Sequence, residues 1–316
     1  MSLTTRSGAL VAVVSLCTAP VVSGQTPAAP PRAPKVTGYL QGRFQSIGDS
    51  ALFLLRRARL GAEGNLTTWA TYKLQAELRT GGTGATATTV GATDLYLGLA
   101  HGQWSGRVGQ FKTPFSRELL QGDDQGELPE RSVVVDSLAP SRDVGFMAEW
   151  TRVRRLTVQG GVFNGEGFNR AQNRDKRMLY VGRAVFVVVR GVEVGGAAAA
   201  FSDSTRWDVE LALERGGWFA RAEYLRQDRR TPADHRDGWY ALTTYTFRPQ
   251  RAQLVGRVEQ FDPGATPGNT KTGYTLGAQY FFRGDDLKLV GAYTVFTEQG
   301  TAVSDNRVIV QMQARW

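Results

Sequence analysis

Basic side chains recur at every second position in several strand-like segments of this chain. In the stretch 55–64, Arg57 and Arg59 alternate with Ala58 and Leu60. Residues two apart lie on the same face of a β-strand, so the two arginines share a face opposite the apolar one. A guanidinium group binds carboxylate or phosphate oxygens through two parallel hydrogen bonds, so a row of them in a narrow aqueous space would attract anions. The same parity selects further candidates for an anion pathway: Arg43, Lys73, Arg107, Arg221, Arg257 and Arg307.

Each arginine also has a plainer interpretation. Glu223 and Glu259 each lie two residues from a basic candidate, and Glu77 lies two residues from Arg79, which has the same parity. A cross-strand ion pair that only stiffens the wall is therefore at least as well supported for any single position. The collective pattern favours an anion pathway more than any one residue does.

The elements that must carry these side chains are β-strands. In Arg206–Glu214, Trp207, Val209 and Leu211 alternate with charged residues, and similar alternation continues to the C-terminus. Sixteen such segments are predicted, at 36–46, 52–63, 69–79, 93–101, 104–111, 143–151, 155–163, 178–189, 192–202, 205–214, 217–227, 237–247, 251–261, 272–282, 286–296 and 306–316.

The connections between these segments alternate between tight turns and longer loops. This alternation, an even strand count and strands of about ten residues predict an all-β fold, a transmembrane antiparallel β-barrel of about sixteen strands with an aqueous lumen. Aromatic residues lie toward strand ends, and Trp316 ends the last strand on its apolar face, the pattern of a C-terminal membrane-insertion signal. A soluble sandwich, a lipocalin-like barrel and a β-propeller fit less well, and the longest apolar run after residue 24, Ala184–Val189, is too short for a spanning helix.

The N-terminus predicts export. Residues 1–24 combine Arg6, an apolar stretch and the small residues before Gln25, as in a secretory signal cleaved after Gly24. Residues 25–35 form a Pro/Ala-rich linker, and 36–316 the barrel. The only cysteine, Cys17, lies in the signal, so the mature chain has neither a disulfide nor a cysteine metal site. The net charge of +9 suits anionic partners, but export and scattered arginines argue against nucleic acid.

One connection is far longer than the others. The stretch 109–118, GQFKTPFSRE, leaves the fifth predicted strand, and Pro114 ends sheet pairing there because it has no N–H to donate. The connection from Lys112 to Arg142 holds six acidic and four basic residues. Loops of this length in compact chains usually have a function.

Two stretches, FLLRRARLGAEG (53–64) and GRVGQFKTPFSRE (106–118), resemble signatures of the phosphate-selective porin O and P family. The resemblance implies a trimeric outer-membrane channel whose third extracellular loop folds into the lumen and constricts it. It places Arg57 and Arg59 in a basic wall, and it adds Lys112, where the chain enters the loop, to the basic residues of the anion pathway. The implied constriction residues are Thr113, Pro114, Phe115, Arg117, Glu118, Asp123 and Asp124. The loop holds more acidic than basic residues, so it differs from a constriction in which lysines bind phosphate.

We therefore expect a porin of the outer membrane, a channel for passive diffusion of small solutes that prefers anions such as phosphate. The expected partners are outer-membrane lipid, small anionic or polar solutes and two further copies of the chain. A structural or adhesive barrel with a plugged lumen and a general, non-selective porin remain alternatives. An enzyme is not expected, since the only histidines, His101 and His235, lie in a turn and a loop. Neither a cofactor nor a metal site is predicted.

Overall fold

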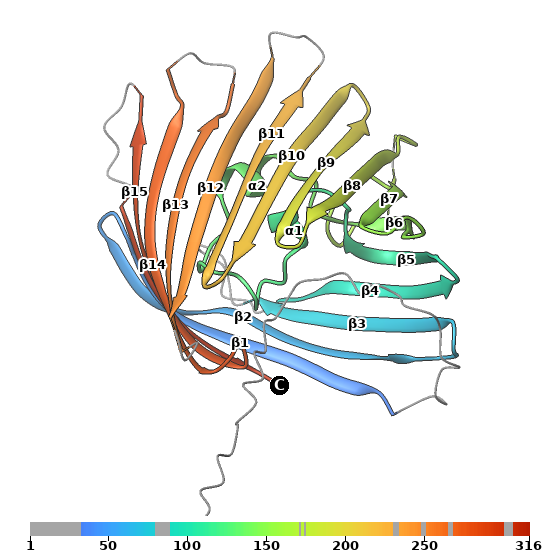
Figure 1. Ribbon diagram of the computed structural model, residues 1–316, viewed down its shortest axis with the longest axis horizontal. Helices are drawn as coiled ribbons and strands as arrows, with labels where there is room; N and C mark the ends of the chain where they lie inside the picture. Colours follow the sequence, from blue (N-terminus) through green and yellow to red (C-terminus); the bar gives the residue numbers. More distant parts are fainter. Residues whose placement is uncertain are drawn as a thin grey trace, which may run out of the picture.

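The chain forms one closed, antiparallel β-barrel (Figure 1). The computed structural model describes residues 33–79, 89–170, 172–173, 175–229, 234–247, 251–264, 268–299 and 306–316. The predicted signal and most of the predicted linker lie outside the described residues. The strands are β1 (Lys35–Ile47), β2 (Ser50–Asn65), β3 (Ala70–Arg79), β4 (Thr89–His101), β5 (Trp104–Lys112), β6 (Arg142–Trp150), β7 (Leu156–Phe163), β8 (Leu179–Val189), β9 (Val192–Phe201), β10 (Ser204–Arg215), β11 (Trp218–Asp228), β12 (His235–Phe247), β13 (Ala252–Asp262), β14 (Lys271–Arg283), β15 (Leu287–Glu298) and β16 (Arg307–Arg315).

Each strand pairs with its neighbours in sequence, and β1 closes the barrel by pairing with β16. The predicted sixteen strands are confirmed. The start of β4 differs most from its prediction, since it begins at Thr89 rather than at residue 93. Thr89 and Val90 pair with Arg79 and Leu78 beyond a register shift between Leu74 and Ala76. That irregularity interrupts the alternation on which the prediction relied.

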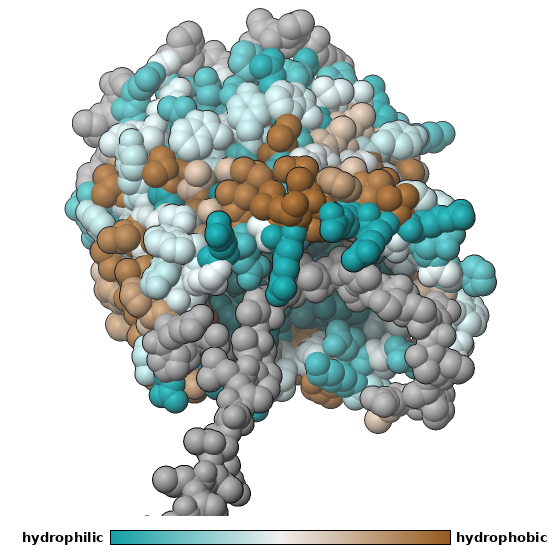
Figure 2. All heavy atoms as spheres, viewed as in Figure 1, coloured by the Kyte–Doolittle hydropathy of each residue, from teal (hydrophilic) through white to brown (hydrophobic). Residues whose placement is uncertain are grey.

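The barrel is apolar outside and polar inside. Large apolar side chains such as Phe53, Leu60 and Leu276 are exposed on the outer wall, and Figure 2 shows hydrophobic residues gathered across the middle of the face in view. Charged and amide side chains of the opposite parity are buried on the inner wall. This arrangement is the reverse of that in a water-soluble protein, and it suits a wall whose outer face meets lipid.

The two ends of the barrel differ. At one end the connections are short, at 66–69, 102–103, 151–155, 190–191, 216–217, 248–251 and 284–286. At the other end lie most of the longer loops, among them the 113–141 segment between β5 and β6, which contains α1 (Arg117–Leu120) and α2 (Val133–Leu138). Neither of these helices, and no other helix among the described residues, has the length and hydropathy needed to cross a membrane.

Candidate functional site

The candidate site is the 113–141 segment and the inner wall that it contacts. It begins in the sequence GQFKTPFSRE, at the end of β5. Gly109 has φ +128°, and a Cβ there would lie 2.2 Å from the Leu95 carbonyl oxygen of β4. Glycine is therefore required where β5 approaches β4 before the chain leaves the sheet.

The two ends of the segment are held together. The Thr113 hydroxyl donates to the carbonyl oxygens of Pro140 (2.7 Å) and Ser141 (3.1 Å). The Lys112 ammonium donates to the Gln121 carbonyl oxygen at 2.5 Å, so it is used inside the segment. These bonds close the base of the loop and direct the chain back over the barrel wall.

Carboxylates of the wall accept from the N-termini of both helices. Glu223 on β11 accepts from the backbone N–H groups of Arg117 (3.0 Å) and Glu118 (2.8 Å) at the start of α1. Glu259 on β13 accepts from the Val133 N–H at 2.6 Å at the start of α2. The first N–H groups of a helix have no hydrogen-bond partner within the helix. These carboxylates therefore supply the missing acceptors and at the same time attach both helices to the wall.

Carboxylates of the segment pair in turn with arginines of the wall. Asp123 lies 2.7 Å from the Arg59 guanidinium of β2, and Glu130 pairs with Arg43 of β1. Glu118 lies 2.9 Å from Arg221 of β11. The segment also pairs with Glu193 of β9, accepts from Lys288 of β15 at the Gly126 carbonyl oxygen (3.2 Å), and pairs with Arg315 of β16 (2.9 Å). Its contacts with the inner wall therefore follow an arc from β9 through β16 to β1 and β2.

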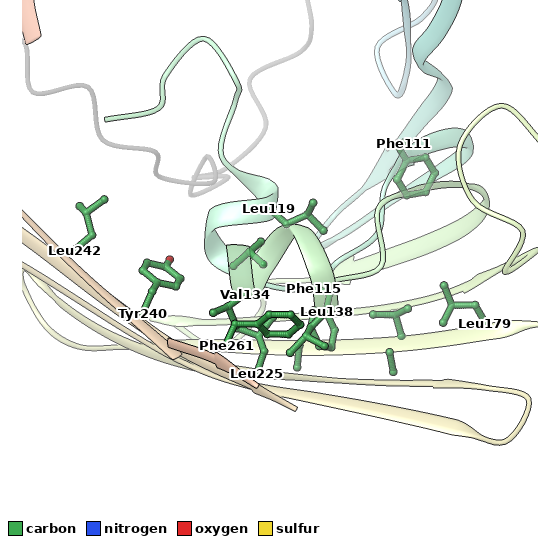
Figure 3. Packing of buried hydrophobic residues seen from close by; sticks show 14 of the residues in the cluster. Phe111, Phe115, Leu119, Val134, Leu138, Leu179, Leu225, Tyr240, Leu242 and Phe261 are labelled. Atoms are coloured by element: carbon green, nitrogen blue, oxygen red, sulfur yellow. The ribbon is translucent and has the colours of Figure 1, made fainter. Parts of the chain in front are cut away.

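An apolar cluster adds a third kind of anchor. Phe115, Val134 and Leu138 of the segment are fully or almost fully buried, and they belong to one cluster with Leu225 and Phe261 of the wall. Figure 3 shows these side chains gathered between the two short helices and the strands. Burying apolar surface this way stabilises the segment against the wall by roughly 1.5–3 kcal/mol per large side chain.

The ion pairs also set the charge state of the segment. Burial by itself would raise the pKa of Asp123, but Lys112, Arg131 and the wall arginines lower it well below its usual range. For Glu130, burial is likewise outweighed by the guanidinium groups of Arg43 and Arg56, which lower its pKa to about 2. Both carboxylates are therefore ionised at neutral pH.

The predicted anion-pathway arginines fall into two groups. Arg43, Arg57, Arg59, Arg221 and Arg257 are buried and lie within 4 Å of a carboxylate. Arg257 pairs with Glu259 (2.9 Å), the neighbour two residues away that the spacing indicated, whereas Arg59 pairs across β2 and β3 with Glu77 (2.5 Å). Arg221 instead pairs with the segment, while Glu223 binds backbone amides. Most of the predicted basic wall therefore holds the segment.

The other predicted basic residues keep more solvent contact. The Lys73 side chain is 30% exposed and lies 3.9 Å from Glu63. Arg107 is exposed, stacks on Tyr96 at 5.2 Å and makes no ion pair among the described residues. Arg307 stacks on Phe296 at 4.9 Å. Lys73 and Arg107 lie on β3 and β5, a sector where the segment makes fewer polar contacts.

Sequence reasoning missed Arg56. Strict alternation would place the Arg56 side chain on the outer face. In the β1–β2 pair, however, the register shifts between Gln41 and Gly42, so Arg56 has no direct partner on β1 and its side chain turns inward. Its guanidinium lies 3.2 Å from Glu130, beside Arg43. The only signal was the doubled arginine of RRAR. The partnership of Glu130 with β1 was also missed, because it joins residues 87 apart in the chain.

Comparisons with known proteins agree with this architecture. The family model described as "Phosphate-selective porin O and P" matches residues 37–195 and 189–316. An uncharacterized protein of Caulobacter vibrioides is 30% identical over 109 residues, which are 34% of this chain and 20% of that protein.

Several solved structures share the fold at low identity. The trimer form of OmpT, an outer membrane protein of Vibrio cholerae, has a TM-score of 0.65 at 13% identity and covers 90% of this chain and 99% of that one. The outer membrane channel DcaP of Acinetobacter baumannii has a TM-score of 0.66 at 11% identity, covering 90% and 97%. A mutant Rh. blastica porin has a TM-score of 0.63 at 13% identity, covering 90% and 100%. At these identities the likeness concerns the fold alone.

Proposed function

The chain belongs to the phosphate-selective porin O and P family, and from this premise we propose that it forms a channel for passive diffusion of small solutes with a preference for anions. It is a porin-like barrel of the outer membrane, a channel rather than an enzyme. The observation that carries the proposal is the attachment of the 113–141 segment to the inner wall along an arc from β9 through β16 to β1 and β2, with fewer contacts to β3 and β4. Such a strap narrows the lumen without closing the whole cross-section.

The remaining passage runs, in this proposal, between the segment and the sector β2–β6. The side chains that still meet solvent there include Arg56, Lys73 and Arg107, with Glu63 and Asp94 as acidic partners of Lys73. Asp94 already pairs with Arg142 at 2.8 Å. Because the acids of the segment are largely occupied by wall arginines, the passage keeps a modest basic excess. That balance supports anion preference over strict phosphate selectivity.

A reversal-potential measurement in a planar bilayer tests this directly. The wild type should favour chloride over potassium, and Lys73→Gln combined with Arg107→Gln should reduce that preference while conductance steps remain. Arg226→Gln is the matched control, since Arg226 is paired with Asp228 at 2.8 Å on the outer face. A cation-selective wild type would contradict the proposal, as would an equal loss of preference in the control.

The plugged structural barrel is the second candidate, and the number of bonds that hold the segment favours it. Absence of conductance steps in the wild type, together with their appearance after removal of residues 117–138, would support the plug.

We also propose that the working unit is a homotrimer. The chain shares its fold with a protein solved in a trimer form. Chemical cross-linking of the protein in native membranes should stop at three copies. A band of one copy under conditions that cross-link a known trimeric porin would contradict this.

A further inference from the structure

An unassigned feature lies at the short-turn end of the barrel, away from the proposed passage. Exposed arginines lie in the turns after β6, β8 and β12, and exposed arginines also end the strands β10 and β14. We call this set the arginine rim: Arg152, Arg154, Arg155, Arg190, Arg215, Arg251 and Arg283. The turns after β2 and β4 contain no arginine. The rim therefore covers an arc from β6 to β15 and not the full circle.

The rim is largely without counter-charges. Only Asp285 and Asp286 lie in the same turns, and Arg283 approaches Asp286 at 3.7 Å. Arg155 donates to the Val188 carbonyl oxygen at 3.3 Å. The other rim arginines make no ion pair with any residue that the structure describes. Seven arginines against two acids supply more than half of the chain's net charge of +9.

The rim borders an aromatic girdle on the outer wall. Trp218 and Tyr245 pack with ring centroids 4.8 Å apart, and Tyr280 and Phe282 with centroids 4.9 Å apart. Trp and Tyr at strand ends lie at the level of lipid headgroups. In Figure 2 a row of hydrophilic residues borders the hydrophobic band where the turns of the central strands lie.

Strand register places part of the rim on the lipid side. Arg215 lies directly opposite Trp218, which is 57% exposed on the outer wall, so their side chains share that face. Arg283 lies opposite Leu287 on β15, and Leu287 lies opposite Ala314 on β16. Ala314 is two residues from Met312, which is exposed on the outer wall, so all three share the outer face. These guanidinium groups are therefore beside the membrane surface and not in the lumen.

We propose that the arginine rim binds the anionic headgroups of glycerophospholipids in the leaflet that surrounds the short turns. In outer-membrane barrels the short turns face the periplasm, so this is the periplasmic leaflet. Guanidinium groups pair with phosphate oxygens in a bidentate way, and basic residues near a membrane surface are attracted to anionic lipid. A lipid so held would fix the height of the barrel in the membrane over the arc from β6 to β15.

Native mass spectrometry of the purified full-length barrel tests the proposal, with dioleoyl-phosphatidylglycerol and dioleoyl-phosphatidylethanolamine as probes. Wild type should retain phosphatidylglycerol preferentially, and retention should fall as salt is raised. Changing Arg154, Arg190, Arg215 and Arg283 together to Gln should lower phosphatidylglycerol retention by about tenfold or more. The same four positions changed to Lys should keep most of it, because the charge remains.

The matched control changes four basic residues of the opposite end, Arg170, Lys176, Arg177 and Arg229, to Gln and should leave retention within about twofold of wild type. Equal retention in wild type and rim variant overturns the proposal, as does equal loss in the Gln and Lys variants. A changed reversal potential with unchanged lipid retention would assign the rim to steering of permeating anions instead. If the Gln variant does not fold, salt-independent phosphatidylglycerol retention by wild type still overturns the proposal.

Discussion

Asp123 is the residue on which the attachment of the segment to β2 depends most. Its side chain is 4% exposed and pairs with Arg59 and with Arg131 of the segment, and Arg57 lies 3.9 Å away. Losing one partner of a buried ion pair costs more than the pair itself contributes, since the remaining charges stay buried without compensation. One carboxylate here serves several guanidinium groups, so its loss affects all of them at once.

Asp123→Asn should therefore weaken the attachment of the segment to β2 by roughly 3–5 kcal/mol. Asp124→Asn is the matched control one residue away. Asp124 pairs with Arg315, whose side chain is 30% exposed, so water screens this pair and its loss should cost less than about 1 kcal/mol. Single-channel recordings should show larger and noisier openings for Asp123→Asn only. Similar recordings from both variants would contradict the assigned role of Asp123.

The strands could be predicted from sequence much more fully than the segment. Alternation is a local property, so strand number and the inward parity of residues such as Arg221 followed from neighbouring residues. The partners of those side chains did not, because Arg221 pairs with Glu118, 103 residues earlier. Arg56 was missed for a different reason, since a register shift turned it inward. What the sequence could not predict were contacts between distant parts of the chain.

The short helix α1 depends on the wall for its N-terminal hydrogen bonds. Hydrogen bonds to a charged acceptor contribute about 1.5–3 kcal/mol, more than bonds between neutral groups. Glu223→Gln should therefore make the amides of Arg117 and Glu118 exchange with solvent at least about tenfold faster, as read by hydrogen–deuterium exchange. Glu193→Gln, which removes only a side-chain partner of Arg117, is the control. Unchanged exchange in Glu223→Gln would show that α1 is held by other contacts.

The segment should also respond to acid, in a defined direction. The pKa of Glu130 is lowered to about 2 in the folded barrel, whereas a free glutamate has a pKa of about 4.3. A lowered folded pKa means that the stabilisation is complete above the unfolded value and is lost as the pH falls toward the folded value. The contribution of Glu130 to the attachment should thus begin to fall below about pH 4 and be largely lost near pH 2, which loosens the segment on its β1 side. Conductance should stay level from pH 7 to about pH 5 and rise only in that acid range.

Glu130→Gln provides the control for the acid response, because it removes the titrating group while leaving Asp123 in place. Its conductance should already be raised at pH 7 and should change less on acidification. A wild-type conductance that rises between pH 7 and pH 5 would point to a different group.

At the scale of the whole molecule, the barrel depends on the joint between its first and last strands. Trp316 N donates to the Gly38 carbonyl oxygen at 3.0 Å, and Gly38 N donates to the Trp316 carbonyl oxygen at 3.2 Å. The indole lies over Gly38, where a Cβ would be 2.6 Å from the Trp316 Cζ2 atom and 2.8 Å from the Arg59 carbonyl oxygen. The terminal aromatic residue therefore has a structural role in closing the sheet, besides its predicted role in membrane insertion.

Gly38→Ala should accordingly destabilise closure by about 1–3 kcal/mol, because either the indole or the β1–β2 backbone must shift. Gly42→Ala on the same strand is the matched control, since nothing lies within 4 Å of a Cβ at that position. The unfolding temperature, read from the heat-dependent gel mobility of the barrel, should fall for Gly38→Ala and stay near wild type for Gly42→Ala.

Replacing the indole by the smaller ring in Trp316→Phe should partly restore the unfolding temperature of Gly38→Ala, because it removes the ring that the new methyl group meets. If both alanine variants unfold at the wild-type temperature, the contact between Trp316 and Gly38 does not limit the stability of the closed barrel.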